Sequence, residues 1–305
     1  MHVTAWHAID AAEMAAVYHA EAARWRDGLA WETDSTWATV EQSRQRGVVP
    51  GFVARDRDGR ICGWSFHLQH RQTLQIGAVN ASSVDATQAL VDAVLDSAEA
   101  RRASRAMAFT LAGAPGLETC LLARGFTVGT YRYLQRTLSP DHDVIVETPQ
   151  ASSAQTLRAW RSTDTPDVTR LLAAAYAHAD RLRPFGGDGR VEDWTEYLLQ
   201  LTTETGCGRF CGNRSVIAER AGGIDGAALV TDLGGRTSHL AQLIVAPPVH
   251  GSGLGRRMLS SAMRDAGRAG FARMTLLVSE QNHVARSLYD RLGFDERASF
   301  VTAAN

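Results

Sequence analysis

The chain has 305 residues, of which 45% are apolar and 21% charged, and its formal net charge is −1. A chain of this size and composition can bury two hydrophobic cores rather than one. The near-neutral charge argues against a nucleic-acid-binding protein. No apolar run reaches the ~18 residues of a membrane helix, and the acidic residues from Asp10 onward do not fit a secretory signal. We therefore expect a soluble cytoplasmic protein, monomeric or homodimeric, without nucleic-acid or membrane partners.

The four cysteines are too few for a disulfide scaffold in a chain of this length. Cys207 and Cys211 lie four residues apart, as in some metal sites, but no second Cys/His pair has the spacing of a zinc site. We expect free thiols and no bound metal.

In the first half of the chain, short apolar runs separated by turn residues predict strands, the first two around the turn Asp58–Gly59. The predicted strands are 51–56, 61–67, 74–79 and 107–111, a helix is predicted at 84–101, and the series ends at Leu121 to Phe126. Residues 139–155 lack sustained periodicity. We predict domains at 1–140 and 156–305, joined by a linker at 141–155.

The second half repeats this order after two helices placed between Pro166 and Thr205. Its predicted elements are the strands 215–220, 227–232, 240–245 and 274–278, the helix 254–268 and the closing segment 288–294. Such internal repetition indicates two copies of one mixed α/β unit in tandem.

A glycine-rich turn, Gly251 to Arg256, lies between the strand 240–245 and the helix 254–268. A turn without Cβ atoms lets backbone N–H groups surround an anion, and a helix N-terminus adds unpaired donors. A P-loop would require Lys and then Ser or Thr after the last glycine, where Arg256 and Arg257 stand, and a dinucleotide fingerprint would require a glycine in place of Arg256. The turn therefore predicts a pyrophosphate site of another kind.

The segment from Val245 to Arg256, V-A-P-P-V-H-G-S-G-L-G-R, resembles the acetyl-CoA signature V-x-P-x-x-R/Q-G-x-G-x-G/A of the GCN5-related N-acetyltransferases, the GNAT family. His250 replaces the usual Arg or Gln. A second segment, Asn282 to Phe294, resembles the family's N-x-x-A-x-x-L-Y-x-x-x-G-F block. The resemblance implies two tandem GNAT-like acyl-CoA N-acyltransferase domains with a mixed sheet (α/β, α+β type).

The resemblance also implies how acetyl-CoA binds in the second half. The strand 243–245 would pair its backbone with the pantetheine arm, the glycine turn would hold the pyrophosphate, and Asn282 would orient the arm, cap the following helix, or do both. The residues expected to bind acetyl-CoA are Leu243, Ile244, Val245, His250, Gly251, Ser252, Gly253, Leu254, Gly255, Arg256, Asn282 and Arg286.

Tyr289 stands seven residues after Asn282, where the family has its general acid. A phenol is protonated at neutral pH and can donate a proton to the departing sulfur. The other interpretation is core packing, because Leu288 and Leu292 lie on the same helix.

The resemblance does not supply a carboxylate as general base. Where some family members carry a glutamate, this chain has Gln242 or its neighbours and Leu277. His239 is the nearest titratable side chain, and alternation places it on one strand face with Ala241 and Leu243. The alternatives are Asp232 as the base, a relay of water molecules that carries the proton to solvent, and a purely structural role for His239.

The first copy lacks this chemistry, because it has Asn80 to Ala86 in place of the glycine turn and no Tyr between Glu118 and Phe126. We expect it to be non-catalytic, either as a structural partner of the second copy or as an altered acyl-CoA site. Substrate recognition is expected from the helices at 166–205. The acidic residues there are balanced by Arg181, Arg183 and Arg190, so the charges do not indicate a substrate. The alternative is that these residues form a solvated loop and helix face.

These features predict an N-acetyltransferase that moves an acetyl group from acetyl-CoA to a primary amine by direct attack in a ternary complex. A small amine, an amino acid and a peptide or protein amine all remain possible acceptors, as does a reaction like that of mycothiol synthase, another tandem protein. The alternative function is a non-catalytic acyl-CoA-binding or sensor protein.

Overall fold

A computed structural model of the protein describes residues 1–139, 155–177, 182–204 and 206–305. Its strands are β1 (His2–Ala5), β2 (Gly51–Arg55), β3 (Ile61–His70), β4 (Thr73–Ala81), β5 (Arg105–Leu111), β6 (Thr127–Thr137), β7 (Thr156–Ala159), β8 (Arg209–Phe210), β9 (Val216–Arg220), β10 (Gly223–Asp232), β11 (Thr237–Val245), β12 (Arg273–Ser279) and β13 (Asp295–Ala304). Its α-helices are α1 (Ala11–Leu29), α2 (Asp34–Gln45), α3 (Val84–Leu95), α4 (Ala98–Arg102), α5 (Leu117–Ala123), α6 (Thr165–Ala175), α7 (Val191–Thr203), α8 (Leu254–Arg268) and α9 (His283–Arg291).

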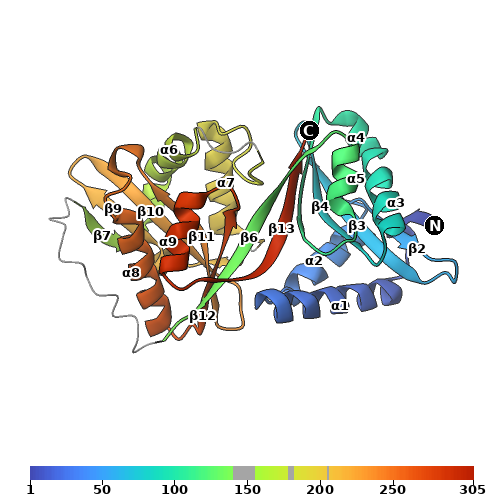
Figure 1. Ribbon diagram of the computed structural model, residues 1–305, viewed down its shortest axis with the longest axis horizontal. Coiled ribbons are helices and arrows are strands. Elements are labelled where there is room, and N and C mark those ends of the chain that lie inside the picture. Colours follow the sequence, from blue (N-terminus) through green and yellow to red (C-terminus); the bar gives the residue numbers. More distant parts are fainter. Residues whose placement is uncertain (140–154, 178–181, 205) are drawn as a thin grey trace.

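The described strands form one continuous mixed sheet that runs through two lobes (Figure 1). The strand order is β1-β2-β3-β4-β5-β13-β6-β12-β11-β10-β9-β7, and β8 pairs with β10. The predicted mixed α/β class is confirmed. Residues 141–154 of the predicted linker lie outside the described residues, and the division at 1–140 and 156–305 stays a prediction.

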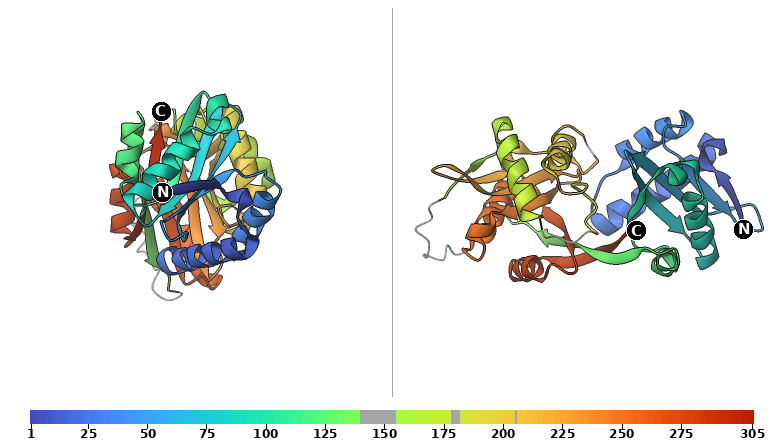
Figure 2. Two further views of the ribbon diagram at one scale, coloured as in Figure 1. Left: turned by 90° about the vertical axis from the view of Figure 1, so that its right-hand side faces the viewer. Right: turned by 90° about the horizontal axis from the view of Figure 1, so that it is seen from above.

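The two halves exchange their last strands at the centre of the sheet. β13, from the end of the chain, pairs with β5 of the first half, and β6 of the first half pairs with β12 of the second. β6 and β13 also pair with each other, and they bridge the lobes side by side (Figure 2). Because each half completes the other's sheet, the hydrogen bonds at the centre fix how the two halves face each other.

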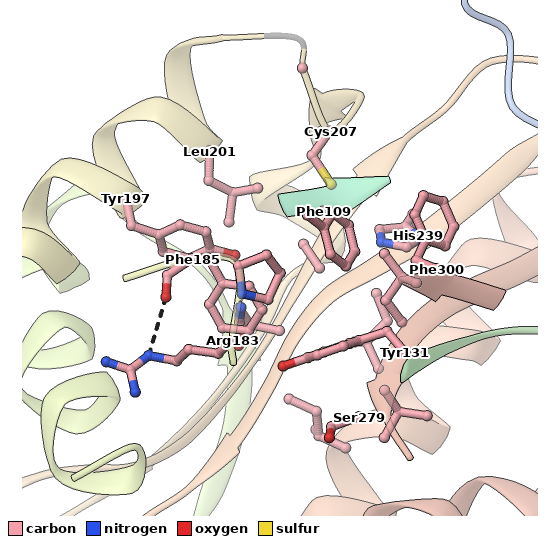
Figure 3. A pocket seen from close by; sticks show the side chains of 18 of the residues that line it. Phe109, Tyr131, Arg183, Phe185, Tyr197, Leu201, Cys207, His239, Ser279 and Phe300 are labelled. Carbon is pink, nitrogen blue, oxygen red and sulfur yellow. Dashed lines mark hydrogen bonds between the residues drawn. The ribbon is translucent and has the colours of Figure 1, made fainter. Parts of the chain in front are cut away.

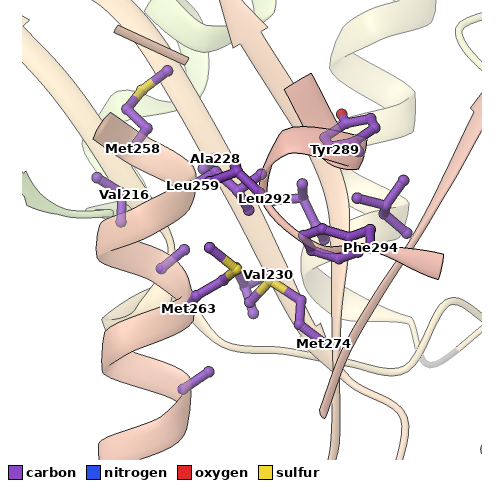
Figure 4. Packing of buried hydrophobic residues seen from close by; sticks show 14 of the residues in the cluster. Val216, Ala228, Val230, Met258, Leu259, Met263, Met274, Tyr289, Leu292 and Phe294 are labelled. Carbon is purple, nitrogen blue, oxygen red and sulfur yellow. The ribbon is translucent and has the colours of Figure 1, made fainter. Parts of the chain in front are cut away.

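Helices cover both faces of the sheet in each half. In the second half, α8 and α9 pack on one face around a core that includes Met258, Met263 and Phe294 (Figure 4). α6 and α7 pack on the opposite face around Trp194. Leu134, from β6 of the first half, is buried in the same core as α8.

The predicted repeat is confirmed in its order, with one correction. The helix expected at 84–101 is two helices, α3 and α4, because Ser97 accepts a hydrogen bond from the backbone N–H of Ala100 and begins a new helix. The helix predicted at 254–268 has those bounds. In the part of the chain that the structure describes, no helix combines the length and apolarity needed to cross a membrane.

We predict that Leu134→Ala lowers the free energy of unfolding by about 2–5 kcal/mol, the cost of deleting a well-packed Leu side chain. Five of the seven tryptophans lie in the first half and the affected core lies in the second, so tryptophan fluorescence and far-UV circular dichroism should report one shifted urea transition. Leu122→Ala, on an exposed face of α5, is the control and should stay within about 0.5 kcal/mol of wild type. Two separate transitions would contradict the coupling of the halves.

Candidate active site

The site begins where two parallel strands of the second half separate. β11 and β12 pair only over Thr237–Leu240 and Arg273–Leu276. Beyond Leu240, β11 keeps its partner β10 on one side, and within the described residues no ladder covers its other edge. The backbone groups of 241–245 therefore form an edge onto which an extended, amide-bearing ligand can add.

A β-bulge lies at the point of separation. Leu229 pairs with Gln242 and Val230 pairs with Leu240, so Ala241 is the extra residue on β11. The prediction that His239 and Leu243 share a face is therefore wrong, because one inserted residue reverses the alternation that follows it. Leu243 packs toward α8, whereas Ala241 packs toward α6 and α7.

The glycine turn lies between the free edge and α8. Gly251 and Gly253 have φ of +77° and +81°, which only glycine adopts without strain. Ser252 donates to the carbonyl of Val249 at 2.7 Å, and a ring nitrogen of His250 lies 2.9 Å from the carbonyl oxygen of Val245. The His250 side chain thus holds the turn against the end of β11.

The N-terminus of α8 points its donors at this turn. No side chain caps the helix, and Arg256 is exposed in its first turn. The side chain of Leu254 is buried in the core, as is that of Ile244 on the opposite face of the sheet. These two residues can therefore reach a ligand through their backbone alone.

Asn282 begins helix α9, and its side-chain oxygen accepts the N–H of Ala285 at 3.1 Å. The predicted capping role is confirmed, and Asn282 also lines the cavity described below. Arg286 donates to the carbonyl of Glu280 at 3.1 Å, which ties α9 to the loop after β12.

Tyr289 lies at one end of the core cluster, against Phe294, and also lines the cavity (Figure 4). Burial, and next the neighbouring Tyr176, raise the pKa of its phenol well above the usual value. The core-packing interpretation of Tyr289 is confirmed, and the ring also lines the cavity. Its role as general acid stays a prediction.

A cavity of about 1040 Å³ lies between the two halves of the molecule (Figure 3). Tyr197 and Leu201 of α7 face Phe109 and Phe300 across it. Residues of β11, β12 and α9 close the cavity on the side of the free edge. These are His239, Leu240, Ala241, Gln242, Leu243, Leu277, Val278, Ser279, Asn282, Ala285 and Tyr289. The glycine turn lies outside this lining.

Gln242 occupies a position where some family members carry a glutamate, and its side chain forms hydrogen bonds with two tyrosines. It accepts from the hydroxyl of Tyr176 and donates to that of Tyr197, each at 2.8 Å. Burial raises the pKa of Tyr176 to about 12 and that of Tyr197 further. This relay fixes α6 and α7 against β11 but contains no group that takes up a proton at neutral pH.

His239 is the base candidate that reaches the cavity. Its ring stacks on Tyr133, and its Nδ1 lies 2.9 Å from the hydroxyl of Thr275. Burial lowers the pKa of His239 to about 4, so the ring is neutral at pH 7. Asp232 instead accepts from Arg209 and from the N–H of Gly234, and it does not line the cavity.

The first half repeats the separation of strands, since β4 and β5 pair only over Thr73–Ile76 and Arg105–Ala108. In this half, side chains of the first half itself occupy the space between the separated strands. Ser83 caps α3, the hydroxyl of Thr110 accepts the N–H of Val79, and Asn80 donates to Glu21 of α1. One backbone donor at the start of α3, the N–H of Ala86, is therefore already used in this half.

The loop before α7 is anchored to the first half. Asp193 is buried and accepts from Arg71, which also pairs with Glu196, and Arg105 pairs with Asp188. The alternative of a solvated helix face is therefore wrong for Asp193 and for Trp194, which is fully buried. Arg181 lies outside the described residues.

The aromatic residues that the first half and β13 contribute to the cavity were not predicted from the sequence. They are Trp25, Trp31, Phe109, Tyr131 and Phe300. The high density of tryptophan before residue 40 was the available signal. Cys207 also lines the cavity, and Cys211 is buried in the core of the second half. Among the described residues, no cluster of His, Cys, Asp and Glu has the arrangement of a metal site.

Part of the chain is similar to known acetyltransferases. The model of the acetyltransferase (GNAT) family matches residues 171–294. A curated relative from Bacillus subtilis (strain 168), named Uncharacterized N-acetyltransferase YhfO, is 40% identical over 62 residues, which are 20% of this chain and 42% of the relative. The match thus spans less than half of that protein's length.

Solved structures share the fold over most of the chain. A GCN5-related N-acetyltransferase from Sphaerobacter thermophilus has a TM-score of 0.61 at 16% identity and covers 84% of this chain and 80% of its own. A tandem GNAT protein from the clavulanic acid biosynthesis pathway has a TM-score of 0.59 at 16% identity, with coverage of 84% and 82%. The segment that matches the acetyltransferase (GNAT) family model thus lies in the second half of the chain, and the solved structures share the fold.

Proposed function

We propose that this protein transfers an acetyl group from acetyl-CoA to a primary amine by direct attack in a ternary complex, at a site in the second half. The observation that carries the proposal is the combination, around one strand, of an uncapped helix N-terminus, a free strand edge and a protonated tyrosine. Each meets one requirement of the reaction.

The binding of acetyl-CoA is assigned to backbone groups. The N–H groups at the start of α8, with Arg256 beside them, would hold the pyrophosphate, and the edge of 243–245 would pair with the amides of the pantetheine arm. The thioester would then lie in the cavity between Leu243 and Tyr289.

In the reaction, the amine nitrogen bonds to the thioester carbon and the carbon–sulfur bond breaks. Tyr289 donates its phenolic proton to the departing sulfur, and its raised pKa keeps it protonated until charge develops there. The amine must also lose a proton. We assign its acceptance to Nε2 of His239, which passes it to water.

This assignment requires the tautomer of His239 that carries its proton on Nδ1. We assign the Thr275 hydroxyl proton to the carbonyl oxygen of Ser238, 3.4 Å away, and Nδ1 of His239 then donates to the Thr275 oxygen at 2.9 Å. Nε2 then carries the lone pair. Because a pKa of about 4 makes the ring a weak base, the amine must bind in its neutral form.

The proposed function is tested by CoA release from acetyl-CoA with a broad panel of primary amines. Amine-dependent release supports it. Binding of acetyl-CoA without release for any amine would favour the sensor function instead.

We predict that Gly253→Asp abolishes acetyl-CoA binding, measured by calorimetry, because a side chain and a negative charge enter the anion site. Gly59→Asp is a matched control. The two glycines have φ of +81° and +79°, and a Cβ at either meets no atom within 4 Å. The backbone strain is thus the same, and binding that weakens equally in both variants would exclude the glycine turn as the phosphate site.

Tyr289→Phe should lower kcat by roughly 10²-fold or more, the range for loss of a general acid, with little change in acetyl-CoA affinity. Steady-state kinetics and calorimetry measure the two quantities. Tyr18→Phe removes another buried hydroxyl, bonded to Glu41 in the first half, and should leave kcat unchanged. Normal turnover by the Tyr289 variant would assign that residue to packing.

The neutral state of His239 predicts how stability depends on pH. The unfolded histidine takes up a proton near pH 6.5, whereas the folded one does so at about 4, so wild-type stability falls as the pH drops through this window. His239→Gln lacks this contribution. Urea titrations should show the stability difference, wild type minus variant, shrinking by roughly 3 kcal/mol between pH 7 and pH 4. A constant difference would mean that the folded ring is not held neutral.

A further inference from the structure

The ring of His239, a residue of the second half, lies against two aromatic side chains of the first half. Tyr133 of β6 stacks on it, with ring centroids 6.1 Å apart and an angle of 13° between the planes. Trp31, from the segment between α1 and α2, lies at 5.9 Å with a tilt of 32°. Because His239 is only 2% exposed, these contacts supply part of the surface that covers its imidazole.

The segment that carries Trp31 is docked on the second half. Ala30, the C-cap of α1, has a left-handed φ of +54° and turns the chain out of the helix. The N–H of Glu32 then donates at 3.1 Å to the carbonyl of Leu233, which precedes the turn between β10 and β11. A Cβ at Gly234 in this turn would lie 2.9 Å from the side chain of Glu32, so glycine permits the close approach. The segment is thus fixed to the turn that leads into β11.

The two rings that contact His239 are themselves fixed by α1. The hydroxyl of Tyr133 donates to the carbonyl of Leu29, in the last turn of that helix, at 3.0 Å. Trp25 of α1 meets Trp31 edge to face, with ring centroids 5.1 Å apart. Tyr133, Trp31 and Leu29 belong to one buried cluster. The C-terminal end of α1 therefore holds both rings in place.

The second half provides one hydrogen bond to the imidazole. Nδ1 of His239 lies 2.9 Å from the hydroxyl of Thr275, and the ring reaches the cavity (Figure 3). A single bond at one ring nitrogen does not define the plane of the ring, because the imidazole can tilt about it. Close packing against Trp31 and Tyr133 restricts this tilt and so determines where Nε2 points.

The titratable groups on the elements around His239, and in the lining of the cavity that it reaches, are Tyr133, Cys207, Arg273, Glu32, Asp232, Arg183 and Glu204. Burial raises the pKa of Tyr133 well above its usual value and that of Cys207 to about 11, so both are neutral at pH 7. Glu32 and Asp232 pair with Arg26 and Arg209. Burial is also what lowers the pKa of His239 to about 4. A side chain that keeps water from this ring therefore acts on its protonation.

We propose that Trp31 is a positioning residue: its ring fixes the plane of the His239 imidazole and keeps water away from it. This rests on the proposed function, in which Nε2 of His239 accepts the proton of the amine. The first half, which lacks the glycine turn, then contributes to catalysis through this ring.

NMR titration of the imidazole tests the positioning without reference to activity. The resonance of His239 is identified among those of the ten histidines by its loss in His239→Gln. In the wild-type protein it should keep one chemical shift from pH 8 to about pH 5. In Trp31→Ala water reaches the ring, and the pKa of His239 should rise to about 5 or higher. Trp31→Phe keeps an aromatic ring and should restore the lower value.

Trp37→Ala is the matched control. Trp37 is another tryptophan of the first half, 8% exposed like Trp31, and its ring packs against Tyr18 and Trp64. This variant should leave the titration of His239 unchanged. If Trp31→Ala folds poorly, Trp31→Leu makes the same test with a smaller loss of apolar volume. An unchanged titration in the folded Trp31 variant, or an equal change in Trp37→Ala, would overturn the proposal.

A double-mutant cycle tests whether Trp31 acts through His239. With kcat measured for the most active primary amine of the panel, Trp31→Ala should lower kcat roughly 10-fold or more, while the Kd for acetyl-CoA stays unchanged. In the His239→Gln background the same substitution should change kcat less than about 2-fold, because the group that it positions is gone. Equal losses in both backgrounds would show that Trp31 acts on another group and would overturn the proposal.

The two experiments also separate this proposal from the proposed function. The expected titration in a protein that releases no CoA with any amine would defeat the proposed function and support the hold of Trp31 on His239. Amine-dependent release of CoA with an unchanged titration would support the proposed function and defeat the positioning role.

Discussion

The exchange of β6 and β13 is the constraint on which the rest of the structure depends. Each strand is supplied by one half and completes the sheet of the other, so neither half can move without breaking a ladder at the centre of the sheet. Side chains from both halves consequently meet at a fixed distance. Phe109 of β5 stacks on Phe300 of β13, and this pair forms part of the cavity wall.

In both halves two parallel strands separate, but the helix that follows begins with a side-chain cap only in the first half. The difference lies in a few residues at the start of each helix. At the start of α3, the hydroxyl of Ser83 accepts a backbone N–H, and Thr110 bridges the gap between the strands. At the start of α8, Gly253 provides no side chain and the donors stay available. A few residues in one turn thus determine which of the two helices begins without a side-chain cap.

Burial shifts the pKa values of Tyr289 and His239 in opposite directions. It raises the pKa of Tyr289 and lowers that of His239, because an apolar surrounding disfavours the charged form of each. The cavity therefore holds a proton donor and a neutral imidazole at the same pH. In the proposed function, the same burial keeps the acid protonated and the base neutral.

The glycine turn, the cap at Asn282, the helix at 254–268 and the repeat were predictable from sequence, because each depends on residues close together in the chain. The faces of His239 and Leu243 were predicted wrongly, since the bulge at Ala241 exists only through pairing with β10. The strand exchange and the aromatic lining of the cavity were also not predictable. They join residues more than a hundred positions apart, such as Phe109 and Phe300, and no local pattern records which strand completes which sheet. The sequence by itself determined the glycine turn and the helix after it, because both are local, and only the tertiary structure decided which side chains of the two halves line the cavity.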